Sequence, residues 1–194
     1  MRLARFLALL SALATLAIAA AGCGGGSSSA SGTKPETWSA DVCGALQTWE
    51  DDLKSGSQQL SSDIRSSTDL KSVKQKLVAF LENAQQSTEK MVDDVKSAGA
   101  PAVKDGPAIQ SDLESGLTEA RGSFQRAVTQ AKKLPTNDPR ALTTGLSSLA
   151  QTIQGELTAT GNHFSNLDTK YDVGDLNKAM AAEPSCKPFV SSTG

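Results

Sequence analysis

Residues 109–134 read IQSDLESGLTEARGSFQRAVTQAKKL, and this stretch carries the pattern that decides the fold. Its apolar side chains recur at steps of three and four residues, which places them on one face of an α-helix. They are Ile109, Leu113, Leu117, Ala120, Phe124, Val128, Ala131 and Leu134. Pro135 follows, and a proline cannot continue a helix. The stretch therefore predicts an amphipathic helix with a narrow apolar stripe.

Three further segments repeat this spacing, over residues 42–64, 70–95 and 142–167. Aromatic residues make up only 4% of the chain, and Val, Ile and Thr never alternate with polar residues as strands require. Four long helices joined by short loops favour an up-down-up-down arrangement. We therefore predict an all-α fold, a four-helix bundle with a short C-terminal fifth helix near residues 175–182.

Helix-capping residues mark the expected ends of these segments. Ser39 is expected to cap the first helix, and Ser67 or Thr68 the second. Gly99 followed by Pro101 is expected to end the second helix, because glycine and proline are common just past a C-terminus. Asp138-Pro139 is a strong start for the fourth, since proline fits the first helical position.

The N-terminus has the form of an export signal. Arg2 and Arg5 precede a run from Phe6 to Ala21 that is too short for a membrane span, which needs roughly 20 apolar residues. The following Gly22-Cys23 resembles a bacterial lipoprotein signal, although Ala20 stands where leucine is usual. The resemblance implies that the Cys23 sulfur receives a diacylglycerol. The alternative is an ordinary signal peptide cleaved near Ala21, with Cys23 as a spare thiol.

These features divide the chain into four parts. Residues 1–22 are expected to be the signal peptide, 23–37 a lipidated cysteine with a tether, 38–188 the helical domain and 189–194 a tail. The tether is rich in Gly and Ser and cannot bury a core, so we expect a flexible spacer of about 20 Å. The protein would then be lipid-anchored at the extracytoplasmic face of the cell membrane.

Two further cysteines, Cys43 and Cys186, remain once Cys23 carries lipid. Exported proteins can keep disulfides, and a short last helix would bring Cys186 back toward the start of the first. We predict that they form a disulfide; two reduced, buried thiols are the alternative. Neither has a C-x-x-C partner, which argues against redox chemistry.

The net charge of the chain argues against a nucleic-acid partner. The chain has 19 basic and 21 acidic side chains, and Arg2 and Arg5 leave with the signal. An acidic product of this kind has no electrostatic footprint for nucleic acid. Lys71, Lys74 and Lys76 cluster, but acidic residues flank them, so we interpret them as a solvated helix face.

The sequence shows no catalytic or metal-binding constellation. His163 is the single histidine and cannot build a zinc site alone. Neighbouring carboxylates such as Asp51 and Asp52 point about 100° apart on a helix and do not converge on one metal. No Gly-x-Ser-x-Gly elbow or phosphate-binding glycine loop occurs. We therefore expect no enzyme activity, no cofactor and no metal.

Gly56 is an anomaly, because it interrupts the apolar stripe of the first helix between two leucines. One interpretation is close approach of helices in an Ala- and Gly-rich sequence. The other is a thin region of the core that accepts an apolar ligand. The residues expected to line it are Trp49, Leu53, Gly56, Phe80, Phe124 and Phe164.

The mature chain resembles the small helical lipoproteins of unknown function found in actinobacteria. The resemblance rests on Gly22-Cys23, on the start from Asp41 to Trp49, on residues 100–139 with their prolines, and on Cys186. It implies no activity. The leading hypothesis is a non-enzymatic interaction protein that binds an envelope protein or cell-wall material. The alternative is a carrier for a lipid or other apolar molecule.

Overall fold

The computed structural model describes residues 31–190, apart from the side chains of residues 157, 160, 161, 163–165 and 190. In that part the chain forms seven α-helices and one 3-10 helix, and no β-strand. The predicted all-α fold class is confirmed. The long helices are α1 (Pro35–Arg65), α2 (Leu70–Ala98), α3 (Gly106–Lys132) and α4 (Pro139–Ser165). The short elements are α5 (Leu167–Lys170), α6 (Gly174–Ala182), η2 (Pro184–Cys186) and α7 (Lys187–Val190).

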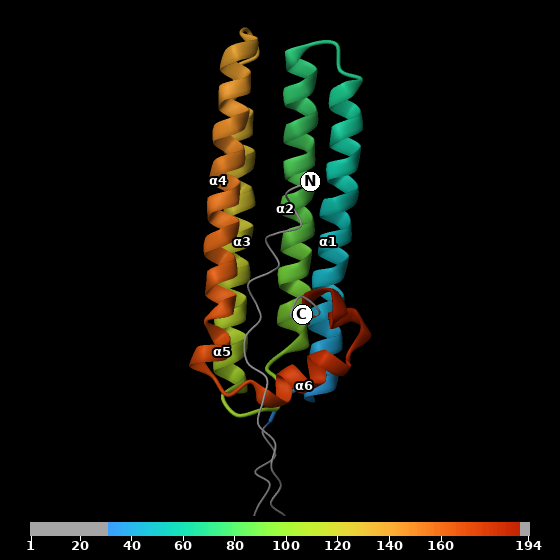
Figure 1. Ribbon diagram of the computed structural model, residues 1–194, viewed down its shortest axis with the longest axis vertical. Coiled ribbons are helices and arrows are strands. Elements are labelled where there is room, and N and C mark those ends of the chain that lie inside the picture. Colours follow the sequence, from blue (N-terminus) through green and yellow to red (C-terminus); the bar gives the residue numbers. More distant parts are fainter. Residues whose placement is uncertain (1–30, 191–194) are drawn as a thin grey trace, which may run out of the picture.

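The four long helices lie side by side (Figure 1). Backbone contacts join α1 to α2, α2 to α3 and α3 to α4, while no comparable contact joins α1 to α4 among the described residues. The turns at residues 66–69 and 133–138 lie together at what we call the upper end. The α2–α3 connection and α6 lie at the opposite, lower end (Figure 1).

The apolar core consists of two clusters stacked along the helices. The lower cluster joins the first turns of α1 to the end of α2, the start of α3 and α6; its fully enclosed members include Val92 and Val95. The upper cluster joins the start of α2, the end of α3 and the first half of α4. Its buried members are Leu81, Ala127, Val128, Ala131, Leu134, Leu142 and Leu149.

The second half of α1 is poorly covered. The buried residues of α1 all lie between Trp38 and Ala45. Leu53 and Leu60 are only half-buried, and Ile64 is 39% exposed. The apolar stripe predicted along the whole helix is therefore only partly covered toward the upper end, because α4 packs on α3 and not on α1.

Two of the expected helix caps are wrong. The first helix begins at Pro35, so Ser39 lies inside it, fully buried, and its hydroxyl has no hydrogen-bond partner. The second helix is capped by Asp69, whose carboxylate accepts from the Ser72 amide at 2.8 Å, because this side chain directly precedes the first helical residue.

The other two helix ends are confirmed. Gly99 ends α2 with φ of 70°, a conformation that costs glycine little and other residues much. Asp138 accepts from the Arg140 amide at 2.8 Å, and Pro139 is the first residue of α4.

A clamp at Thr33 fixes where the chain enters α1. The Thr33 amide donates to the Ala100 carbonyl at 2.8 Å, and the Ala102 amide donates to the Thr33 carbonyl at 2.7 Å. The Thr33 hydroxyl also donates to the Ala98 carbonyl at 2.6 Å. These bonds form an isolated parallel bridge between Thr33 and Pro101. The N-terminal segment is thereby held against the α2–α3 connection, at the lower end.

The predicted disulfide between Cys43 and Cys186 is confirmed. It joins α1 to the end of η2 across 143 residues, with the two Cα atoms 5.0 Å apart. Both cysteines are completely buried. α6 covers the whole range expected for a short last helix, and η2 follows it, so that the chain turns back onto α1.

We predict that replacing both cysteines, Cys43→Ser with Cys186→Ser, lowers the free energy of unfolding by roughly 2–5 kcal/mol, because the unfolded chain loses its longest constraint. Urea denaturation followed by circular dichroism measures the change. Cys23→Ser is the matched control and should leave the midpoint unchanged. An unaltered midpoint in the double variant would contradict the prediction.

Candidate functional site

A shallow groove between α1 and α2 brings together three of the residues expected to line an apolar site. Leu53 and Gly56 face it from α1, and Phe80 faces it from α2. Its volume is about 210 Å³. Gly56 makes the groove possible, since a Cβ atom there would lie 3.1 Å from the Phe80 ring. Asn83 and Ala84 complete its wall on α2.

The rim of this groove is polar. The Ser87 hydroxyl on α2 donates to a carboxylate oxygen of Asp52 on α1 at 2.6 Å. Ligand pockets usually enclose about 300–1,000 Å³, so the groove is smaller than a typical small-molecule site. Its size and its apolar floor suit a single apolar side chain or the end of an acyl chain.

The other residues predicted for the apolar site do not line the groove. Trp49 packs against the lower cluster, and its indole nitrogen donates to the Thr88 hydroxyl at 2.9 Å. Phe124 is buried on α3. The side chain of Phe164 lies outside the described residues, as does that of His163. Cys23 lies outside them as well.

A second hollow, of about 390 Å³, lies lower between α1 and α2. Gly44, Ala45 and Ala98 give it a floor of small residues, and Asp41 and Asp94 bring carboxylates to its edge. The Asp94 carboxylate is already paired with Lys90 at 2.5 Å. No group of three or more potential metal ligands occurs among the described residues.

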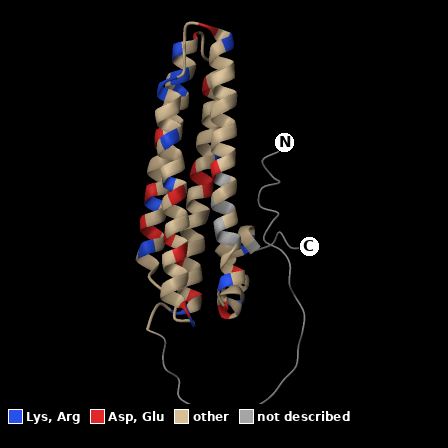
Figure 2. Cartoon of the chain, turned by 90° about the vertical axis from the view of Figure 1, so that its left-hand side faces the viewer, with Lys and Arg blue, Asp and Glu red and all other residues tan. Residues whose placement is uncertain are grey.

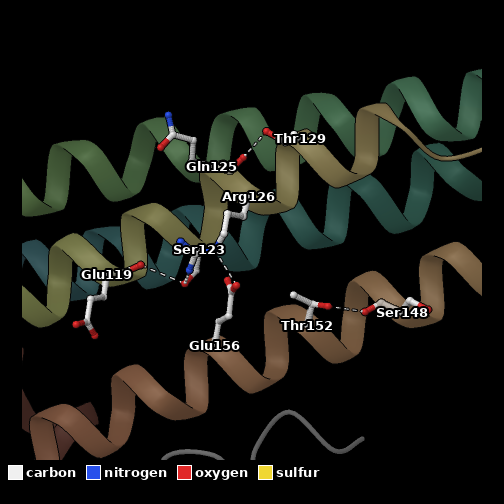
Figure 3. Close-up of polar contacts among 8 residues, drawn as sticks. All are labelled: Glu119, Ser123, Gln125, Arg126, Thr129, Ser148, Thr152 and Glu156. Carbon is white, nitrogen blue, oxygen red and sulfur yellow. Dashed lines mark hydrogen bonds and ion pairs between the residues drawn. The ribbon is translucent and has the colours of Figure 1, made fainter.

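Two ionic clusters hold helices together. Arg126 on α3 donates to Glu156 on α4 at 2.8 Å and to the Ser123 hydroxyl at 3.1 Å, as Figure 3 shows. The Glu156 carboxylate raises the pKa of Arg126. One oxygen of Glu156 is buried and has no hydrogen-bond partner among the described residues. The arrangement is a brace between two helices, because an always-charged guanidinium is a poor proton donor or acceptor.

The second cluster fixes the start of the C-terminal segment. Asp112 on α3 accepts from the Lys170 ammonium at 2.5 Å and from the Tyr171 hydroxyl at 2.9 Å. The ammonium also lies 5.0 Å from the centre of the Tyr171 ring. The hydrogen bond to Asp112 raises the pKa of Lys170, so the amine is a fixed cation and not a nucleophile.

Sequence reasoning missed the Thr33 clamp and both ionic clusters. The partners that join different elements lie 30 to 69 residues apart and follow no periodic pattern, so no local sequence signal predicts them. The buried Gln110 was missed for the same reason: its amide joins α3 to the Val95 carbonyl of α2 at 3.0 Å.

No protein-family model matches the chain, and no curated protein or solved structure matches it either.

We predict that Gly44→Ala and Gly56→Ala change stability unequally. Both exchanges favour the helix, by about 1 kcal/mol. A Cβ at Gly44 meets no atom within 4 Å, whereas one at Gly56 forces the Phe80 ring to shift. Urea denaturation should show the full gain for Gly44→Ala and a smaller gain or a loss for Gly56→Ala. Equal gains would show that Phe80 does not close onto Gly56.

Proposed function

We propose that this protein is a non-enzymatic lipoprotein, anchored through Cys23 to the extracytoplasmic face of the cell membrane, that binds an envelope partner through its helices. The observation that carries the proposal is the clamp at Thr33. It fixes the entry of the N-terminal segment at the lower end, so a tether leading to residue 23 attaches the anchor to the lower end and leaves the upper end as the part that reaches farthest from it.

The same proposal assigns the four long helices to an up-down-up-down bundle, with α6 as its short fifth helix. The contacts between consecutive helices and the alternation of the connections between the two ends support this assignment. The side of α1 that faces away from α2 is then available to a partner, because α4 does not cover it.

Nine residues separate Cys23 from Thr33, and eight of them are Gly or Ser. Fully extended, they reach at most about 30 Å. None of the helices in the described part is long and apolar enough to cross a bilayer. A lipid on Cys23 would supply the attachment, and two or more acyl chains are enough for stable anchoring.

We predict that Cys23→Ala releases the protein from membranes. Without the sulfur no diacylglycerol can be attached. Metabolic labelling with an alkyne fatty acid, followed by membrane fractionation, checks the outcome; Ser28→Ala is the matched control and should remain labelled and membrane-bound. Retention of the Cys23→Ala protein in membranes would overturn the proposed anchor.

Partner binding is tested separately, in cells. A photo-crosslinking amino acid at Ile64 should capture an envelope component, and the same group at the distant Lys104 should not. Turnover of an envelope substrate that disappears on exchange of one polar side chain would refute the non-enzymatic assignment.

The groove at Gly56 supports a second candidate function, carriage of a lipid or other apolar molecule. Native mass spectrometry of the full-length protein from its natural host should then show a co-purifying small molecule. Gly56→Leu fills the groove and should abolish that adduct, while Gly155→Leu on α4 should retain it, since a Cβ there meets open space. A clean apo mass would exclude the carrier.

A further inference from the structure

Positive charge gathers at the upper end of the molecule. We define the basic tip as residues 63–82 and 132–140, which form the two upper turns and the helix ends beside them. The tip carries seven basic and four acidic side chains, whereas the rest of the described chain carries ten basic and seventeen acidic ones. Figure 2 shows several Lys and Arg residues in blue near the top, while most of the red residues lie lower, where further blue ones are mixed among them.

The acidic residues of the tip are already engaged. Asp63 lies 3.7 Å from the Lys76 ammonium, and Glu82 lies 2.7 Å from that of Lys132. Asp69 and Asp138 accept from backbone amides at the starts of α2 and α4. None of the four is free to neutralise a neighbouring cation fully.

Five cations of the tip form no ion pair within the described residues. Lys74 donates instead to the Leu134 carbonyl at 2.9 Å, which ties α2 to the end of α3. The remaining four are exposed, and each belongs to a different part of the fold: α1, α2, the C-terminal cap of α3 and α4. They are Arg65, Lys71, Lys133 and Arg140.

This arrangement could not be found in one segment of sequence. Lys71, Lys74 and Lys76 alone are a helix face flanked by acidic residues. The fold brings cations from three other helices beside them. The acidic residues of the tip are engaged in ion pairs or in helix caps. The result is a surface that presents several unpaired positive charges from different helices.

The chemistry of the tip favours a hydrated polyanion over a protein. Protein interfaces have a desolvated centre rich in aromatic residues. The tip exposes one large apolar side chain among the described residues, Ile64, and no aromatic one. The uncharged polar residues of its loops are exposed or half-buried: Ser66, Ser67, Thr68, Thr136 and Asn137. Hydroxyl and amide groups beside dispersed cations suit a polymer that offers both charge and hydrogen-bonding groups.

We propose that the basic tip binds an anionic glycan polymer of the cell envelope, one that bears phosphate or carboxylate groups along its length. The inference rests on the proposed function, because attachment at the lower end leaves the tip as the part of the molecule that can reach farthest from the bilayer and into the wall. It identifies the envelope partner as wall material.

Retention on immobilised polymers tests the proposal with full-length protein in a neutral detergent. Linear polyphosphate and polygalacturonate separate the phosphate from the carboxylate source, and dextran is the neutral reference. The tip variant combines Arg65→Gln, Lys71→Gln, Lys133→Gln and Arg140→Gln. The matched control removes four unpaired cations elsewhere, by Lys54→Gln, Lys96→Gln, Lys104→Gln and Lys187→Gln.

The parent protein should bind at least one polyanion, with an affinity that falls steeply as salt rises, because counterions are released on binding. The tip variant should lose on the order of tenfold or more in affinity and show a shallower salt dependence. The control, which has the same net charge, should stay within about twofold of the parent. Circular dichroism verifies that both variants are folded.

Equal losses in both variants would overturn the proposal, since they would reflect net charge alone. So would failure of the parent protein to bind either polyanion. If crosslinking in cells instead captures an acidic protein, and the tip variant loses that crosslink, the glycan assignment is wrong while the proposed envelope-binding function stands. If the tip variant binds both polyanions as well as the parent does, but an envelope component is still captured at Ile64, then the proposed glycan site is wrong and the envelope-binding function stands.

Discussion

The disulfide between Cys43 and Cys186 holds the end of the chain against its beginning. The segment after α4 consists of short helices, none long enough to be stable by itself in water. Leu176 and Ala179 bury a small apolar surface against α1. Asp112 on α3 holds the start of this segment through the hydrogen bond that it accepts from Lys170. The disulfide fixes the end of this segment to α1. The segment therefore covers the lower cluster on the side where α4 does not reach α1.

The two ends of the molecule consequently differ in kind. The lower end is crosslinked, clamped at Thr33 and predominantly acidic. The upper end has a core confined to α2, α3 and α4, a poorly covered α1 and an excess of positive charge. The groove at Gly56 lies between these regions, where Phe80 leans toward a missing side chain. A protein that is fixed at one end and exposes distinct chemistry at the other is suited to presenting a surface.

Much of the fold could be predicted from the sequence, because helices and their ends are local. The apolar spacing located all four long helices, and Asp138 and Gly99 marked boundaries correctly. The cap at Asp69 was missed because Thr68 and Ser67, one and two residues earlier, also have side chains that can cap a helix. The poor coverage of the second half of α1 was not predicted. The apolar spacing shows which face of a helix is apolar, but not whether another helix packs on that face.

Less of the candidate site could be predicted, because its parts meet only in three dimensions. The choice of Leu53, Gly56 and Phe80 was reasonable, since glycine in an apolar stripe implies room beside it. Phe124, also expected there, lies buried elsewhere on α3, and the charge of the tip depends on four helices at once. The Thr33 clamp has a mechanical consequence. A pull on the N-terminal segment loads the hydrogen bonds to Ala100 and Ala102 first, which spreads the force to α2 and α3 before α1 can begin to unwind.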